Sequence, residues 1–115
     1  MKKITEDNKT NQAELKGMSQ KMFAGLVKAV VDVEKEVMIV DADLHADEEK
    51  VLLEDGSKQE NLWGINLYPD LINTDDFVEF DSMINIRPRQ DNCSRGVEDV
   101  KIQEKIREVV RKLVM

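Results

Sequence analysis

The chain has 115 residues, of which 41% are hydrophobic and 36% charged, and its net charge is −7. This length suits one domain, and the apolar share is too high for general disorder. The longest apolar run, residues 23–27, is far shorter than the roughly 20 residues that span a membrane. Because Cys93 is the only cysteine and the acidic start is unlike a signal peptide, we expect a cytoplasmic protein with no internal disulfide and no membrane contact.

The first part of the chain predicts a helix after a short lead-in. Lys2–Thr5 is either a first strand or part of a flexible segment covering residues 1–10. Asn11 followed by Glu14 resembles a capping box, in which a side chain binds the free amides at a helix start. We therefore expect a helix over residues 11–22.

The next part predicts a hairpin. Residues 27–34 are rich in β-branched residues at alternating positions, and residues 37–40 form a second β-branched run, so the two predict antiparallel strands. Residues 46–56 leave two alternatives open. We favour a helix over 48–55 with Asp47 as its cap, and the alternative is a strand over 51–53.

Two strands and a helix complete the prediction. Residues 62–68 alternate in the manner of a strand that ends at Pro69, and residues 77–87 form the longest strand candidate. Asp99 then caps a final helix with one apolar stripe. The order β-α-β-β-α-β-β-α, with short turns, predicts an α+β fold in a single domain over 1–115. We expect an antiparallel or mixed five-stranded sheet with three helices covering one face.

The strand predicted over 77–87 has a polar face, made of Glu79, Asp81, Asn85 and Arg87. If helices cover one face of the sheet, this polar face is solvated. If helices cover both faces, it is buried and a pocket is expected. Trp63 alternates with apolar neighbours and is interpreted as a core residue.

Four tracts stand out along the chain. They are LHADEE at 44–49, SKQ at 57–59 running on to WGINLYP at 63–69, DSMINIRP at 81–88 and SRGVED at 94–99. They resemble a small prokaryotic family catalogued as a domain of unknown function, and the likeness spans residues 20–115. The resemblance implies a compact bacterial or archaeal cytosolic domain and implies no activity.

The loop before Arg95 departs from that family. In the family it reads glycine-asparagine-basic-serine-arginine, whereas here Asp91 and Cys93 stand at the first and third of these positions. The departure weakens an anion-binding role for the loop. Cys93 itself is interpreted as an incidental thiol, because the chain has no second cysteine to resolve an oxidised form.

Asp41, Asp43, His45 and Asp47 alternate along the chain, so on a continued strand they would share one face. Carboxylates and an imidazole can hold Mg²⁺ or Mn²⁺. We favour a solvated acidic edge that leads into a helix, because the spacing fits neither an EF-hand nor the usual zinc motifs. No metal and no cofactor are therefore assigned. His45, the only histidine, is interpreted as binding the backbone rather than as a general acid or base.

The strongest candidate for a ligand site is the loop over residues 87–96. Guanidinium groups suit carboxylate or phosphate, and amide and hydroxyl donors lie between them. The favoured alternative is that these arginines pair with the acidic block over 32–86. The candidate ligand-binding residues are Arg87, Arg89, Asn92, Ser94 and Arg95.

The charge pattern limits the partners. Residues 1–31 and 87–115 each carry a net charge of +3, whereas residues 32–60 carry −8 and 61–86 carry −5. The acidic middle would repel phosphates, so nucleic acid is not an expected partner.

No catalytic set stands above background, so the sequence leaves catalysis open. It favours a non-catalytic interaction or regulatory domain that self-associates as a homo-oligomer through an exposed sheet edge. The alternative is a small-anion or nucleotide-binding domain, or an enzyme, that uses the loop over 87–96.

Overall fold

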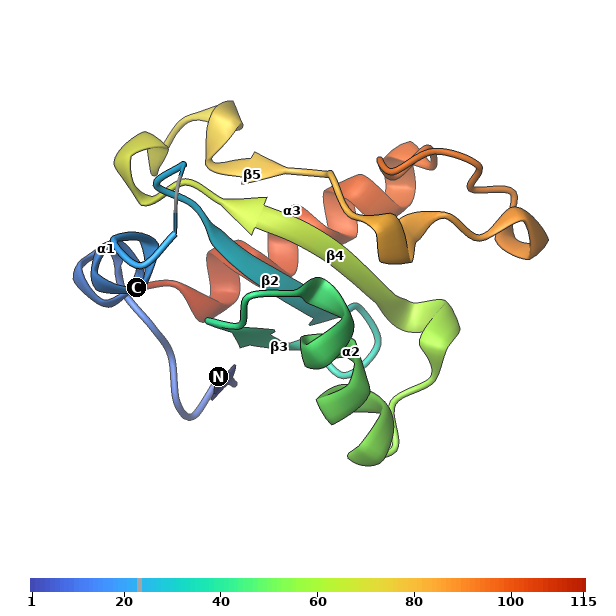
Figure 1. Ribbon diagram of the computed structural model, residues 1–115, viewed down its shortest axis with the longest axis horizontal. Coiled ribbons are helices and arrows are strands. Elements are labelled where there is room, and N and C mark those ends of the chain that lie inside the picture. Colours follow the sequence, from blue (N-terminus) through green and yellow to red (C-terminus); the bar gives the residue numbers. More distant parts are fainter. Residues whose placement is uncertain (23) are drawn as a thin grey trace.

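The computed structural model describes residues 1–22 and 24–115. Within these residues, five strands form one open antiparallel sheet in the order β1–β3–β2–β4–β5 (Figure 1). The strands are β1 (Lys2–Ile4), β2 (Val27–Asp32), β3 (Val37–Val40), β4 (Leu62–Leu67) and β5 (Val78–Glu79), and the helices are α1 (Gln12–Ser19), α2 (His45–Glu54) and α3 (Val100–Leu113). The chain order is the predicted one, and the α+β fold is confirmed.

The predicted hairpin is present as β2 and β3, which pair from Ala29 with Val40 to Asp32 with Val37. The side chain of Asp32 holds the turn, because its Oδ1 accepts the backbone N–H groups of Glu34 and Lys35, both at 2.9 Å. The short first strand is also present, since β1 pairs with β3.

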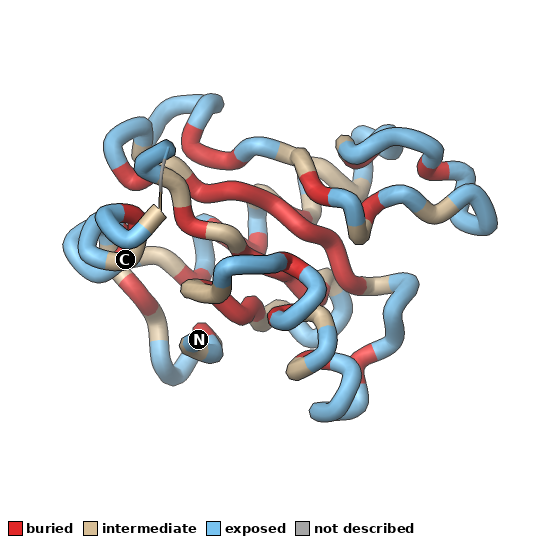
Figure 2. Tube along the Cα trace, viewed as in Figure 1, coloured by how far each residue is buried: buried red, intermediate tan, exposed pale blue. Residues whose placement is uncertain are grey.

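The helices lie on both faces of the sheet, which corrects the expectation that all three cover one face (Figure 1). Val27, Ala29 and Val31 of β2 belong to the larger apolar core together with residues of α1 and α3. Val30 points the other way and packs with Leu52 of α2 in a smaller core. Because β2 carries buried apolar residues on both faces, both faces need a cover. Buried backbone accordingly runs through the middle of the molecule (Figure 2).

The helix ends differ from the predicted ones. α1 is capped by Asn11 as predicted, with the N–H of Glu14 donating to Asn11 Oδ1 at 2.9 Å, but it ends at Ser19. α2 begins at His45, two residues before the predicted cap, and the alternative strand over 51–53 is wrong. The carboxyl group of Glu48 turns back and accepts the N–H of Ala42 at 3.1 Å, which ties the first turn of α2 to the segment that follows β3.

α3 forms as predicted, with Asp99 accepting the N–H of Lys101 at 2.8 Å. Its stripe is buried in the larger core through Ile106, Val109 and Val110, among others. Among the described residues, no helix is both long and apolar enough to cross a bilayer.

The long strand predicted over 77–87 is wrong beyond Glu79. β5 has two residues, and a 3₁₀ turn over Met83–Asn85 replaces the rest. The turn begins at Ser82, whose hydroxyl accepts the N–H of Ile84 at 3.3 Å. Polar and apolar residues do alternate over 77–87. At this edge of β4, however, the side-chain amide of Asn85 binds the backbone that a longer β5 would have paired with.

Candidate functional site

The edge of β4 is closed by the side chain of Asn85 instead of by a neighbouring strand. Asn85 Oδ1 accepts the N–H of Gly64 at 2.8 Å, and Nδ2 donates to the carbonyl oxygens of Gly64 at 2.9 Å and Arg95 at 3.0 Å. One amide thus satisfies both free groups of Gly64 and also holds the backbone of the following loop. This side chain is fully buried.

Asn92 holds the loop from within. Its Nδ2 donates to the carbonyls of Asn85 at 2.7 Å and Gly96 at 2.8 Å, and its Oδ1 accepts the N–H of Glu98 at 2.8 Å. Only 3% of Asn92 is exposed. Together the two asparagines attach the loop to the sheet and determine where Arg95 leaves the backbone.

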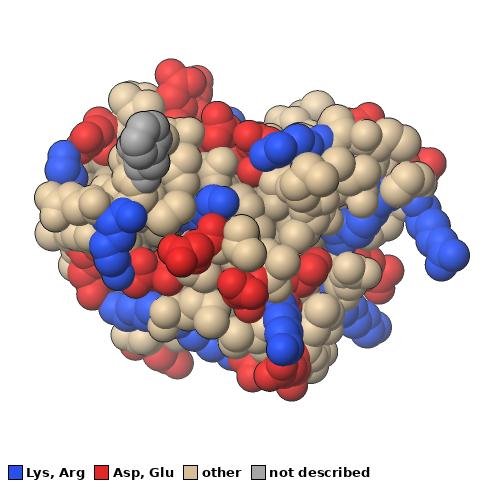
Figure 3. Space-filling view, in the orientation of Figure 1, with Lys and Arg blue, Asp and Glu red and all other residues tan. Residues whose placement is uncertain are grey.

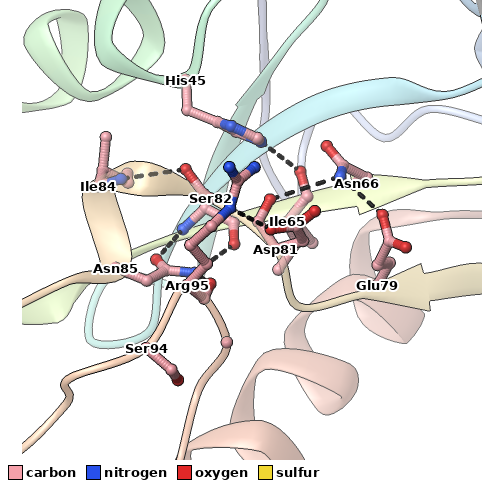
Figure 4. Close-up of polar contacts among 12 residues, drawn as sticks. His45, Ile65, Asn66, Glu79, Asp81, Ser82, Ile84, Asn85, Ser94 and Arg95 are labelled. Carbon is pink, nitrogen blue, oxygen red and sulfur yellow. Dashed lines mark hydrogen bonds and ion pairs between the residues drawn. The ribbon is translucent and has the colours of Figure 1, made fainter.

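A hollow of about 190 Å³ lies between the start of α2 and the segment that follows β5. Figure 3 shows basic and acidic side chains mixed over the face of the molecule that it presents. The sticks in Figure 4 show that its polar groups come from several elements and point toward one another. Its polar lining residues are Lys28, His45, Asn66, Asp81, Ser82 and Arg95.

His45 is buried at the first position of α2, and its Nε2 donates to the carbonyl of Ile65 on β4 at 2.7 Å. Burial lowers the pKa of His45, and the charges of Lys28 and Arg95 add to this, although the hydrogen bond to Ile65 and the charge of Asp81 oppose the shift. The ring is therefore neutral at neutral pH. Since a carbonyl can only accept, the proton sits on Nε2 and Nδ1 keeps its lone pair.

Two cations face the hollow. Arg95 donates from Nε to Asp81 Oδ1 at 2.6 Å, and its terminal nitrogens point toward His45 (Figure 4). Lys28 lies on the α2 face of β2, opposite Asn66 in the register of the sheet. Within the described residues its ammonium has no hydrogen-bond or ion-pair partner. The hollow thus contains one paired cation and one unpaired cation.

Asn66 completes the floor of the hollow. Its Nδ2 donates to Glu79 Oε1 at 2.8 Å, while its Oδ1 is buried and has no partner in the described part of the chain. Glu79 also accepts the hydroxyl of Tyr68 at 3.0 Å. These contacts fix the amide next to the hollow.

The residues of the predicted loop site have separate surroundings. Arg95 lines the hollow, and Asn92 is buried inside the loop. Ser94 and Arg89 are exposed. The backbone N–H groups of Cys93 and Ser94 donate to the carboxylate of Glu98 at 2.6 and 3.0 Å, so a side chain of the protein already occupies the loop's anion-facing amides.

Arg87 has a different environment from Arg95. Its guanidinium lies over the ring of Trp63, 4.2 Å from the centroid, and donates to the carbonyls of Gln59 and Leu62. Trp63 is buried in the core, as predicted. The polar face predicted for residues 79–87 is thus divided, with Asp81 at the hollow and Arg87 over Trp63.

The four alternating residues at 41–47 do not meet. Asp41 pairs with Lys21 at 2.9 Å, whereas His45 turns toward Ile65. In the described residues, no three His, Cys, Asp or Glu side chains lie close enough together to hold a metal ion.

Sequence reasoning missed Lys28, Asn66 and Ser82 as lining residues. Lys28 and Asn66 are each a polar residue inside an apolar strand, and the register places them side by side. That interruption was the available signal. To recognise that the two residues are neighbours, one must know that β2 pairs with β4. The alternation within either strand alone does not reveal this pairing.

Residues 3–113, from β1 to the end of α3, match a family described as "Protein of unknown function (DUF5674)". No curated protein and no solved structure matches the chain. The match confirms the resemblance to a domain of unknown function. Because the family description names no activity, the function is argued from the geometry of the hollow. By this match over nearly its whole length, the chain belongs to the DUF5674 family.

Proposed function

We propose that the protein is a non-catalytic regulatory domain that binds a small anionic ligand in the hollow beside α2. The observation that supports this most directly is the unpaired ammonium of Lys28 next to the free guanidinium nitrogens of Arg95. A cation without a counterion in a partly buried place is unfavourable unless an anion joins it. A bound anionic ligand would pair with both Lys28 and Arg95.

The volume of the hollow limits the size of the ligand. At about 190 Å³ it is smaller than the roughly 300–1,000 Å³ of sites for drug-sized molecules. Inorganic phosphate, a short dicarboxylate or the phosphate end of a nucleotide fits such a space. Guanidinium nitrogens bind carboxylate and phosphate oxygens in pairs, and an ammonium adds a point charge.

The remaining groups favour a ligand that also carries a hydrogen-bond donor. Nδ1 of neutral His45 accepts, as does the carboxylate of Asp81. The lip of the hollow is apolar, with Leu44 55% and Met83 65% exposed. A ligand with an anionic end, a hydroxyl or amine, and a short apolar part would satisfy all three features.

The loop prediction remains part of the proposal. Arg95 belongs to both sites, while Arg89 and Ser94 are exposed and lie in the predicted loop outside the lining of the hollow. The backbone amides of the hollow and those of the loop over 87–94 are different residues. One NMR titration therefore shows which of the two places binds the ligand.

The experiment is an NMR titration of the full chain at low salt with phosphate, a nucleotide and succinate. We expect saturable shifts of the amides of Lys28, His45, Asn66 and residues 81–84 and 95. The Lys28→Gln variant should bind about tenfold more weakly, because a charge-assisted contact is lost. Lys50→Gln, an exposed change on α2, is the matched control and should bind as the wild type does.

Three results would count against the proposal. Shifts restricted to residues 87–94 would move the site to the loop, and no localised shift at millimolar ligand would remove the site altogether. Chemical conversion of the ligand during incubation, followed by NMR of the ligand itself, would contradict the non-catalytic role.

A further inference from the structure

A second and larger hollow lies between the C-terminal half of α3 and the turn at residues 72–75. It encloses about 590 Å³, which is within the range of sites for small organic molecules. Its lining is mixed: Ile72, Phe77 and Val114 are among its apolar residues, and Gln12 and Asp75 are among its polar ones. We call it the α3 groove. It shares no lining residue with the hollow beside α2.

The mouth of the α3 groove is held in shape by short-range hydrogen bonds. The hydroxyl and the N–H of Thr74 both donate to the carbonyl of Leu71, at 2.6 and 3.1 Å. The hydroxyl of Thr74 also accepts the N–H of Asp76 at 3.2 Å. Asn73 adopts a left-handed conformation with φ 69°, which asparagine tolerates better than most residues. The groove is therefore formed before any ligand enters, which lowers the entropy lost on binding.

Two arginines one helical turn apart face the groove from α3. Arg107 is fixed, because its Nη1 donates to the carbonyl of Asp75 at 3.1 Å and its guanidinium lies 5.0 Å from the ring centroid of Phe80. Arg111 is exposed and has no hydrogen bond or ion pair within the described part of the chain. Among the described residues, neither guanidinium pairs with a carboxylate, so the groove joins apolar side chains to two arginines, of which only Arg111 keeps all its donors free.

We propose that the α3 groove binds a small monocarboxylate with an apolar body, such as a medium-chain fatty acid. The carboxylate pairs with Arg111, and the apolar body covers Ile72, Phe77 and Val114. A carboxylate matches the two parallel donors of a guanidinium. Asp75 also lines the groove, so a multiply charged phosphate ester would meet more like-charge repulsion there than a single carboxylate does. This inference is independent of the function proposed above.

The test compares three ligands with the same eight-carbon chain: octanoate, 1-octanol and octylammonium. Each is titrated into the full-length chain below its aggregation limit and followed by NMR. We expect octanoate to shift the amides of residues 72–78 and 107–114 in a saturable manner. The alcohol and the amine should bind at least about tenfold more weakly, because the contact with a charged guanidinium is absent or repulsive.

Two variants locate the site. Arg111→Gln should weaken octanoate about tenfold and leave octanol unchanged, whereas Lys101→Gln at the other end of α3 is the matched control and should change neither. Ile72→Trp should fill the groove and abolish the shifts. The amide spectrum of each variant shows whether it has folded.

The inference would be overturned by equal binding of octanol and octanoate, since the arginine would then contribute nothing. It would also be overturned if no ligand binds at millimolar concentration, or if octanoate binds the Ile72→Trp variant normally. Shifts of the same amides with protein concentration alone would show that a second copy of the chain occupies the groove, which also contradicts the inference.

Discussion

Arg87 shows how a charged side chain becomes part of the fold. Its guanidinium covers the Trp63 ring and donates to two backbone carbonyls at the end of the segment that enters β4. Burial lowers the pKa of Arg87, and the nearby charge of Glu49 opposes that shift. The planar guanidinium of Arg87 presents two donors side by side, and these bind the carbonyls of Gln59 and Leu62 where no strand pairs with them.

Replacing Arg87 with alanine should lower the free energy of unfolding by about 2 kcal/mol, because bonds from a charged donor and a cation–π contact are lost together. Urea unfolding followed by the fluorescence of Trp63, the only tryptophan, measures the change. Arg89→Ala removes an exposed arginine two residues away and should stay within about 0.5 kcal/mol of the wild type. Equal losses for the two variants would contradict the structural role of Arg87.

Glu48 is a fully buried carboxyl group whose Oε1 has no partner among the described residues. Burial raises the pKa of Glu48 to about 9, although the N–H of Ala42 and the charge of Lys28 lower it. The folded protein therefore holds this proton at pH 7, whereas the unfolded chain, with an ordinary pKa near 4.5, does not. The contribution of Glu48 to stability is thus fully present below about pH 4.5 and is lost progressively up to about pH 9.

The Glu48→Gln variant should remove this pH dependence, because glutamine keeps the shape and stays neutral. Its stability relative to the wild type should rise with pH, by up to about 1.4 kcal/mol per pH unit between the two pKa values. Urea unfolding at pH 5, 7 and 8.5 tests this, with the exposed Glu54→Gln as control. Parallel stability curves for Glu48→Gln and the wild type would show that Glu48 ionises normally.

At the scale of elements, the segment over 81–85 owes its place to a glycine on β4. A Cβ atom at Gly64 would lie 2.6 Å from Cβ and Oγ of Ser82 and 3.1 Å from Cγ1 of Ile84. The segment therefore rests directly on the backbone of β4, close enough for Asn85 to bind both polar groups of Gly64. This close approach brings Asp81 and Ser82 to the hollow.

Gly64→Ala should destabilise the fold by about 1–3 kcal/mol through this overlap, and it should weaken ligand binding in the hollow because residues 81–85 must move. Gly17→Ala in α1 is the matched change, since nothing lies within 4 Å of the added atom. It should stabilise the protein by up to about 1 kcal/mol, because alanine favours helix more than glycine does. Thermal melting of both variants checks the opposite signs, and a tolerated Gly64→Ala would contradict the close approach.

For the molecule as a whole, the charges are dispersed although the sequence groups them. Ion pairs join the basic ends to the acidic middle, as in Lys3 with Asp55 and Lys112 with Glu36. Figure 3 shows both signs mixed over the visible face. With a net charge of −7, we expect no binding to single-stranded or duplex oligonucleotides at low salt, as measured by fluorescence anisotropy. Tight binding that weakens steeply with salt would contradict this expectation.

Self-association through a sheet edge stays a prediction. The strands at the two edges, β1 and β5, have three and two residues, and short edge strands disfavour pairing between sheets. Light scattering over a range of concentrations measures the oligomeric state. A dimer whose interface maps to β1 would support the prediction, and a monomer at every concentration would remove it.

The sequence by itself determined the order of the strands and helices, the β2–β3 hairpin and the buried stripe of α3. These follow from local alternation, capping residues and helical spacing, which neighbouring residues are enough to establish. The Asn11 and Asp99 caps are examples, since each binds an amide two or three residues away.

Only the tertiary structure decided which face α2 covers, where the predicted long strand ends and which polar residues meet. Asn85 binds Gly64 across 21 residues, and His45 binds Ile65 across 20. A periodic pattern carries no information about partners so distant. It predicted a polar strand face at Asp81 and Asn85, whereas long-range hydrogen bonds to β4 convert that face into a turn and a hollow.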